Sequence, residues 1–330
     1  MPTSGTISNT VFETRVLIDR AYGRCRLRPQ QITDGMIDRA QSNLYLILSD
    51  MSNTGTPVWC LQKQMLTLTQ GQPALTLPVG TVDVRNAFLR RQSTLIPDSG
   101  PVISSGSITF NFSVNGAQLP NSIGITWTST PIALTLQTSP DNSFWTTAAS
   151  VSAASGTGLQ WIDTEGASQA IYWRLIPSGT GTISASSVTM GYQLSEIMLG
   201  RLNADSYESY PNKASQGAPL QFFLDRQLVP IMRLWASPDA ASALLPMVVY
   251  RQRYIMDVGT LPQTIEVPQY WYDPIVWKLS ATLAWETPEC DAKLIPMLEQ
   301  KAEQSMRLAW NQDRDKSPIS FKYAIGAYTR

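Results

Sequence analysis

Near both ends of the chain, apolar residues recur at helical spacing. Residues 9–28 carry one apolar stripe, and Pro29 ends it. A second stripe starts after Thr33, a residue suited to cap a helix N-terminus, and runs to Met51. Because the link between the two stripes is short, the pattern predicts an antiparallel pair of helices.

Three further helices are predicted in the last part of the chain. The first covers Ser195 to Tyr207. The second begins at Asp273-Pro274, where the aspartate caps the helix and the proline takes its first position. The third covers residues 289–311 and buries a stripe that includes Leu294 and Leu298.

Between the helices, apolar and polar residues alternate with period two, which is typical of β-strands. Turn residues such as Gly71 and Pro73 separate neighbouring runs. The pattern therefore predicts antiparallel hairpins that fold together with the helices. Outside residues 101–194, the alternating runs are Trp59–Thr69, Ala74–Leu77, Val82–Arg90, Gln221–Arg226, Ile231–Trp235 and Leu244–Tyr254.

Residues 101–194 show many short alternating runs, such as Ile123–Trp127 and Ile171–Leu175, separated by Gly, Ser and Pro turns. Runs of this kind predict a β-sandwich or jelly roll. The region also contains four tryptophans, whose rings either fill the space between two sheets or stack on sugar rings. Packing is the favoured interpretation. The four are Trp127, Trp145, Trp161 and Trp173.

Charge marks the same region. Of the 25 basic and 25 acidic residues, only Asp141, Asp163, Glu165 and Arg174 fall within residues 101–194. A composition that changes at both edges of a segment predicts one domain inserted into another. A surface with so little charge is also unusual for a free-standing domain, so we expect a neighbour to cover one side of it.

The fold class expected from these patterns is α+β: a helical-bundle body with an antiparallel β tip, plus an inserted all-β sandwich. Residues 1–100 would supply the first half of the body, with a helix hairpin and a β-hairpin. Residues 101–194 would form the insert. Residues 195–330 would supply the second half of the body, ending in a tail from about residue 316.

Composition disfavours several kinds of site. The sequence has no histidine, the commonest metal ligand and general base, and its three cysteines are far apart. It contains neither a GxxxxGK[ST] loop nor a GxGxxG turn, and no run of roughly 18 apolar residues. We therefore expect no catalytic residue, no metal, no cofactor and no membrane partner. Three widely separated cysteines predict no disulfide framework, so we expect the chain to be made in a reducing cytoplasm.

Two groups of charged residues leave alternatives open. Arg20, Arg24 and Arg28 recur at every fourth residue, which favours a solvated or ion-paired helix face over contact with DNA or a neighbouring subunit. Paired carboxylates can hydrolyse glycosides, although turns and helix ends explain these pairs more simply. The pairs are Asp163 with Glu165, Glu286 with Glu289, and Asp313 with Asp315.

The tail that follows Asp315 is mainly alternating and largely apolar. Chain termini are poorly ordered unless something ties them down, so an apolar tail needs a partner. That partner is either the body of the same chain or another chain, and strand addition to another chain is slightly favoured. The apolar residues are Ile319, Phe321, Tyr323, Ile325 and Tyr328.

The outer halves of the chain resemble the head-to-tail adaptor proteins of short-tailed bacteriophages, the family of tubular tail protein A and the tail accessory factors. The part that resembles them most is QFFLDRQLVPIMRLWASPDA, residues 221–240, followed by PMVVYRQRY, residues 246–254. The other segments that carry the resemblance are the opening helix pair, LTLTQGQPALTLPVGTVDVRNAFLRR (66–91), VPQYWYDPIVWKLSATLAWE (267–286) and LAWNQDRDKSPISFKYAIGAYTR (308–330).

The resemblance implies a structural virion protein at the head–tail junction, assembled in the host bacterial cytoplasm. It implies a ring, expected to be twelve-fold, that joins the portal protein to the tail nozzle or tail fibres. Double-stranded DNA would pass through the ring during ejection, and the apolar tail residues would dock on the portal. Zero net charge is compatible with a duplex that slides rather than sticks.

The insert departs from this family. LQTSPDNSFWTT (136–147) and IYWRL (171–175) resemble galactose-binding or discoidin-like modules, with Trp145 and Trp161 as the expected ligand or partner face. A glycan-binding tail component is therefore the first alternative function. A carboxylate-dependent hydrolase of cell-wall or capsule polysaccharide is the second.

Overall fold

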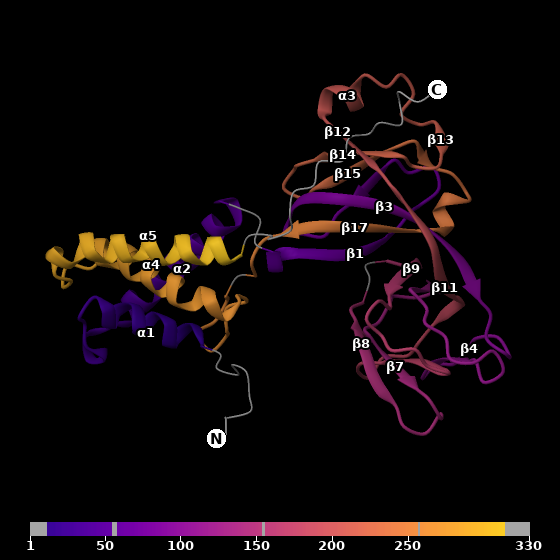
Figure 1. The fold of residues 1–330 in the computed structure, drawn as a ribbon, viewed down its shortest axis with the longest axis horizontal. Helices are drawn as coiled ribbons and strands as arrows, with labels where there is room; N and C mark the ends of the chain where they lie inside the picture. Colours follow the sequence, from indigo (N-terminus) through magenta and orange to yellow (C-terminus); the bar gives the residue numbers. More distant parts are fainter. Residues whose placement is uncertain (1–11, 55–57, 154–155, 257, 314–330) are drawn as a thin grey trace, which may run out of the picture. The chain divides into compact units, whose positions relative to one another are not determined.

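The structure is a computed structural model that describes residues 12–54, 58–153, 156–256 and 258–313. The chain divides into two compact units (Figure 1). The helical unit combines Met1–Leu61 with Arg253–Arg330, and the β unit is Gln62–Gln252.

Four helices of the helical unit share one apolar core. They are α1 (Thr14–Arg24), α2 (Asp34–Thr54), α4 (Tyr272–Glu286) and α5 (Ile295–Gln312), with single 3-10 turns at Pro29–Gln31, Val58–Cys60, Gln269–Trp271 and Ala292–Leu294. Helix α4 is central, because it packs against α1, α2 and α5. Its buried residues include Ile275, Leu279 and Leu283, which meet Leu17 of α1 and Leu44 of α2 in the core.

The helices lie close to their predicted positions. Helix α2 starts at Asp34, directly after the predicted cap. Helix α4 starts at Tyr272, so the prediction that Asp273 caps it is wrong, and Asp273 and Pro274 lie in its first turn. Helix α1 covers Thr14–Arg24 and ends before the predicted residue 28. Helix α5 begins at Ile295 rather than residue 289, because Asp291 caps a 3-10 turn before it. No described helix is long and apolar enough to cross a membrane.

The β unit is built on one six-stranded sheet with the order β1-β17-β3-β11-β6-β9. The strands are β1 (Leu61–Thr67), β17 (Pro246–Arg253), β3 (Thr81–Leu95), β11 (Ala185–Met198), β6 (Ser122–Trp127) and β9 (Gly158–Asp163). Figure 1 shows β3 and β11 as long strands of this unit.

Two smaller sheets accompany the six-stranded sheet. The five-stranded sheet has the order β4-β5-β10-β7-β8, from β4 (Val102–Ile103), β5 (Ile108–Asn111), β10 (Tyr172–Pro177), β7 (Leu134–Ser139) and β8 (Thr146–Val151). The four-stranded sheet has the order β12-β14-β15-β2, from β12 (Gly200–Leu202), β14 (Gln221–Asp225), β15 (Ile231–Trp235) and β2 (Ala74–Thr76). The remaining elements are α3 (Ala204–Glu208), a 3-10 turn at Ser242–Leu244 and the pair β13 (Gln216–Gly217) and β16 (Ser237–Pro238).

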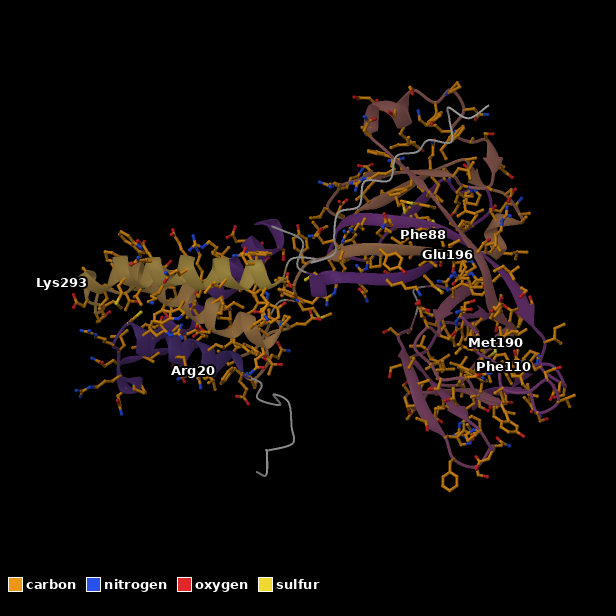
Figure 2. All side chains as sticks on the ribbon, in the orientation of Figure 1. Arg20, Phe88, Phe110, Met190, Glu196 and Lys293 are labelled. Atoms are coloured by element: carbon orange, nitrogen blue, oxygen red, sulfur yellow. The ribbon has the colours of Figure 1, made fainter. Side chains whose placement is uncertain are left out.

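Each smaller sheet shares an apolar core with part of the six-stranded sheet. Phe110 and Trp173 of the five-stranded sheet pack with Met190 of β11, and Figure 2 shows Phe110 and Met190 in the same region. Phe222 of the four-stranded sheet packs with Leu89 of β3 in a second core. The β unit therefore contains two β-sandwiches that share one sheet.

Strand β11 connects the two sandwiches. Residues 185–191 pair with β6, and residues 190–198 pair with β3. The helix predicted over Ser195–Tyr207 is wrong over most of its length: the chain is strand to Met198, strand again over Gly200–Leu202, and helical only over Ala204–Glu208. The ladder partners on β3 decide the conformation of Ser195–Met198, and a single-sequence pattern does not contain them.

The two units differ from the division expected from charge composition. The expected edge at residue 194 falls inside β11, and β3 and β17 of the outer halves belong to the β unit. The all-β sandwich predicted for residues 101–194 is present, with β5, β10 and β7 on one side of its core and β6 and β11 on the other. The six-stranded sheet continues beyond residues 101–194, because β11 pairs with β6 inside the insert and with β3 outside it.

Candidate functional site

Two of the three arginines of the predicted row make contacts within the helical unit. The Arg24 guanidinium forms an ion pair with Asp273 and lies 3.8 Å from the centre of the Trp277 ring, so it fastens α1 to α4. The Arg20 guanidinium lies over the Phe12 ring at 4.2 Å, and Figure 2 shows Arg20 on α1. Arg28 is exposed and follows the helix end. Contact of these arginines with DNA or a neighbouring subunit stays a prediction.

Three of the four insert tryptophans are packed inside the β unit. Trp127 and Trp173 lie in the sandwich core, where their indole N–H groups donate to Gln160 Oε1 and to the Ala170 carbonyl oxygen. Trp161 is only 7% exposed and packs with Met65 and Val248. These three rings pack against apolar neighbours, which is the role that the sequence favoured for the tryptophans.

Gly124 explains why Trp161 lies where it does. Gly124 and Trp161 are cross-strand partners on β6 and β9. A Cβ atom at Gly124 would come within 2.7 Å of the Trp161 ring. The absence of a side chain on β6 therefore lets the indole lie against the strand.

Trp145 differs from the other three because it lies on the surface of the sandwich. The Arg174 guanidinium lies 4.0 Å from the centre of its ring, and Arg174 Nε donates to Gln137 Oε1 at 2.8 Å. The neighbouring Phe144 is 79% exposed. Arg174 and Gln137 are cross-strand partners on β10 and β7, so the sheet register sets this arrangement.

The turn before Trp145 is organised by Asp141. Its Oδ1 accepts hydrogen bonds from the backbone N–H groups of Phe144 at 3.0 Å and Ser143 at 2.9 Å. These two backbone donors, that of Phe144 first, lower the pKa of the Asp141 carboxyl group. The ionised carboxylate therefore holds the turn that carries Phe144 and Trp145. Phe144, which is exposed, and Trp145, which is half-buried under the Arg174 guanidinium, form an aromatic surface on which a flat, neutral ligand can stack.

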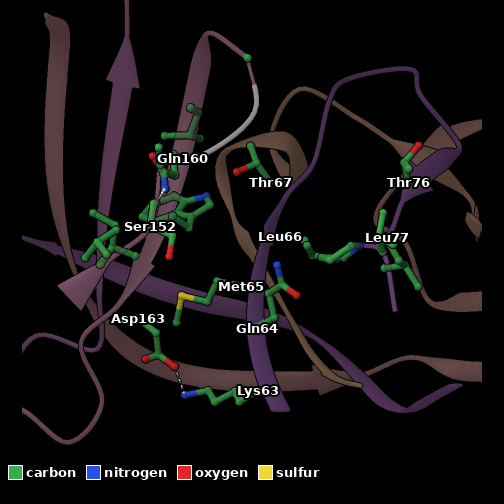
Figure 3. Close-up of a pocket in the computed structure, with 18 of the residues that line it drawn as sticks. Lys63, Gln64, Met65, Leu66, Thr67, Thr76, Leu77, Ser152, Gln160 and Asp163 are labelled. Atoms are coloured by element: carbon green, nitrogen blue, oxygen red, sulfur yellow. Dashed lines mark hydrogen bonds and ion pairs between the residues drawn. The ribbon is translucent and has the colours of Figure 1, made fainter. Parts of the chain in front are cut away.

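A cavity of about 820 Å³ lies beside β1, and Figure 3 shows its lining. Gln64 Oε1 and Trp161 Nε1 are buried in its wall and have no hydrogen-bond partner among the described residues. Because both atoms are covered, a ligand in the cavity would reach them only after side-chain movement. Buried polar atoms without a hydrogen-bond partner would favour a polar ligand. In this wall, however, Gln64 Oε1 and Trp161 Nε1 do not face the open space of the cavity.

One carboxylate pair of the sequence, Asp163 with Glu165, has a structural partner in this wall. Lys63 Nζ lies 2.8 Å from Asp163 Oδ2, and it also forms an ion pair with Glu165. Figure 3 shows Lys63 pointing toward Asp163. The two carboxylates share one cation, which links β1 to the end of β9.

In each of the other two pairs, one carboxylate has a hydrogen-bond partner of its own. Glu286 accepts a hydrogen bond from Asn43 Nδ2 at 2.7 Å, while Glu289 is exposed in the turn after α4. Asp313 accepts a hydrogen bond from the Tyr270 hydroxyl at 2.7 Å, and burial, followed by this contact, raises the pKa of Tyr270 to about 12. Asp315 lies outside the described residues. Over the described ranges, no cluster of three or more Cys, Asp or Glu side chains could hold a metal ion.

The helical unit carries exposed apolar residues that the sequence patterns did not single out. Tyr45 and Leu46 on α2 are 52% and 60% exposed, beside a hollow of about 400 Å³ lined by Gln41 and Val258. On α4, Trp285 is 68% exposed beside a groove of about 430 Å³ between α4 and α5. The signal was available, since these residues interrupt the polar side of otherwise amphipathic helices.

The tail residues predicted to dock on the portal lie outside the described residues: Ile319, Phe321, Tyr323, Ile325 and Tyr328. The sequence also missed the role of Arg174, although it stood out as the only cation of the insert. Its sequence separation from Trp145 gave no sign that the fold would place Arg174 of β10 over the ring of Trp145, which directly precedes β8.

No protein-family model matches this sequence, and no match was found among curated proteins. Several solved carbohydrate-binding modules are similar to part of it. The module CpGH89CBM32-6 produced by Clostridium perfringens is 11% identical, with 32% of this chain and 93% of that chain covered and a TM-score of 0.24. The family 32 carbohydrate-binding module of C. perfringens NanJ, solved with galactose, is 14% identical, with 42% and 97% covered and a TM-score of 0.22.

A chitosan-binding module from a chitosanase/glucanase of Paenibacillus sp. IK-5 is also 14% identical, with 35% of this chain and 100% of that chain covered and a TM-score of 0.22. At these TM-scores, no conclusion about the function of this chain follows from the likeness.

Proposed function

We propose that this chain is a structural assembly protein, the head-to-tail adaptor of a short-tailed bacteriophage. Copies would form a ring that joins the portal to the tail and surrounds the DNA channel. The resemblance of residues 221–254 and 267–286 to that family suggests the role. One observation supports assembly: the helical unit exposes Tyr45 and Leu46 side by side on α2.

Exposed apolar residues that gather on one surface mark sites of protein contact. A closed ring needs a heterologous interface, in which one surface of a copy meets a different surface of the next. Helix α2 offers Tyr45 and Leu46, and α5 offers Met297 and Leu308, which are 47% and 66% exposed. The helical unit therefore carries two different exposed apolar surfaces, as a heterologous interface between neighbouring copies requires.

The test is the oligomeric state of the full chain, alone and mixed with portal protein, by mass photometry and negative-stain electron microscopy. Rings are expected for the natural chain, and the double variant Tyr45→Ser with Leu46→Ser should not form them. Leu228→Ser is the matched control, because Leu228 is also exposed but belongs to the β unit. A chain that stays monomeric under all these conditions would exclude the adaptor proposal.

Carbohydrate binding by the sandwich is the second candidate function, and the Trp145–Arg174 surface favours it. An aromatic surface in contact with a guanidinium and an amide suits a sugar, whose apolar face stacks while its hydroxyls accept and donate hydrogen bonds. Trp161 is not part of this candidate site, because it is buried. The insert would then give the assembly a place to hold a glycan.

A glycan array followed by titration of the best ligand tests this candidate. Trp145→Ala should abolish the signal, whereas Trp161→Phe should preserve affinity and lower only stability. An array without any signal, or a signal that survives in Trp145→Ala, would remove carbohydrate binding at this surface. Neither result affects the ring, so the two proposed functions are tested separately.

A further inference from the structure

The groove between α4 and α5 has an unusual combination of exposed aromatic surface and negative charge. Trp285 of α4 is 68% exposed, and its Nε1 donates to Glu299 Oε1 of α5 at 2.8 Å, which holds the indole at the groove. Glu286 and Glu303 also line the groove, and Lys278 is the one cation among the described lining residues. The floor is apolar, since Ala281 and Ala302 are buried.

An occupant of this groove must bring apolar side chains and positive charge. Residues 316–330 of the same chain have both. They include Lys316, Lys322 and Arg330, contain no Asp or Glu, and place aromatic or branched apolar residues at alternating positions. Opposite charges favour the encounter, and the apolar side chains supply the area that is removed from water.

The distance is within reach of the chain. Helix α5 ends at Gln312, and Glu299 lies 13 residues before it, or about 20 Å along the helix. The 17 residues 314–330 span up to about 56 Å when extended. The segment can therefore turn back along α5 and reach the groove of its own helical unit.

We propose that residues 316–330 dock into the α4–α5 groove of their own chain, with the lysines and Arg330 facing Glu286, Glu299 and Glu303 and an aromatic residue against Trp285. This contact covers the apolar segment until another partner displaces it. The inference does not depend on the adaptor function, because any protein partner of the segment would compete with the groove.

Hydrogen-exchange mass spectrometry of the full chain, without any partner, tests the docking. The amides of residues 316–330 should be protected relative to the rates of the free peptide. Glu303→Gln, which removes one groove charge and preserves the shape, should reduce protection by about two- to fivefold. Trp285→Ala should reduce it by roughly tenfold, because the main apolar contact is lost. High salt should weaken protection in the natural chain.

Glu289→Gln is the matched control, because Glu289 is an exposed carboxylate that does not line the groove. It should leave the protection unchanged. Three results would overturn the proposal: exchange of the segment at free-peptide rates, protection that is equal in Trp285→Ala, or protection that rises with protein concentration. The last result would show docking between copies instead of within one.

Discussion

Arg90 on β3 and Glu196 on β11 lie opposite each other in the ladder, with Arg90 Nη2 2.6 Å from Glu196 Oε1. The Arg90 side chain is only 3% exposed. Figure 2 shows Glu196 beside Phe88, which lies on the neighbouring strand β3. The pair lies where β11 leaves the inserted sandwich and joins the second one, so it fixes the register at the junction of the two.

Replacing Glu196 with Gln should therefore destabilise the β unit strongly. The change leaves a buried guanidinium without its counter-charge, at a cost of roughly 3 kcal/mol. Urea denaturation followed by circular dichroism measures the loss. Asp19→Asn serves as the control, because its partner Arg15 is 42% exposed and an exposed pair contributes less than about 1 kcal/mol. Similar losses in the two variants would show that Arg90 does not depend on Glu196.

Gly124→Ala should also destabilise the β unit, through a steric conflict with Trp161. The added Cβ would lie 2.7 Å from the ring, and overpacking of this kind costs about 1–3 kcal/mol. Gly106→Ala is the control, because nothing lies within 4 Å of a Cβ there. In a Trp161→Leu background the penalty of Gly124→Ala should shrink, and a double-mutant cycle measures that difference. If Gly124→Ala costs as much stability in the Trp161→Leu background as in the natural chain, the Trp161 ring is not the cause of the loss.

The ladder also predicts where the inserted sandwich can be removed. Leu95 and Met190 are cross-strand partners, so replacing residues 96–189 with Asn-Gly should close β3 and β11 into a hairpin. Replacing residues 101–194 with a Gly-Ser linker removes the β11 residues that pair with Gln92–Leu95. Thermal unfolding should show one cooperative transition at a higher temperature for the first variant. If the first variant unfolds at a lower temperature than the second, the pairing of residues 190–193 with β3 contributes little to stability.

This junction also shows what the sequence could predict. The alternation of Ile123, Ile125 and Trp127 placed a strand correctly, because these three side chains pack into the core of the inserted sandwich. Ser195–Met198 has no such one-sided pattern, and its strand conformation depends on Arg90 and the rest of β3. Local periodicity therefore identified the elements with a simple buried face, and it missed the element whose partner decides its structure.

The environment of each insert tryptophan likewise depends on residues of other strands, which a local sequence pattern does not contain. The sequence drew attention to Trp145 and Trp161 equally, since both are tryptophans in an uncharged region. Gly124 allows Trp161 to be buried, while Arg174 lies over Trp145 at the surface. Each outcome depends on a residue from another strand, so residue type alone could not separate the two. The helical-bundle body and its ring stay a proposal that rests on residue resemblance and on the exposed surface of α2.

A fourth prediction concerns the buried cysteines of the helical unit. Burial raises the pKa of the Cys60 thiol to about 11, and burial followed by the neighbouring Cys290 raises that of Cys25 to about 12. All three cysteines are buried and out of reach of a reagent, and for Cys25 and Cys60 the reactive thiolate is also disfavoured. A thiol reagent such as dithionitrobenzoate should therefore modify none of them in the folded chain at pH 8. In urea all three should react. Fast reaction of the folded protein would contradict the packing of the core.

The same shifts predict how stability depends on pH. A thiol in the unfolded chain releases its proton near pH 9, whereas the folded Cys60 keeps its proton to about pH 11, so the unfolded state binds fewer protons between these values. The contribution of Cys60 to stability is therefore complete below pH 9 and is lost as the pH rises toward 11. From pH 8 to pH 10.5, the free energy of unfolding should fall by about 1–2 kcal/mol more in the natural chain than in Cys60→Ala. Comparison of these two chains cancels the titration of lysines and tyrosines that they share, and equal losses in both would show that the Cys60 thiol titrates alike in the folded and unfolded states.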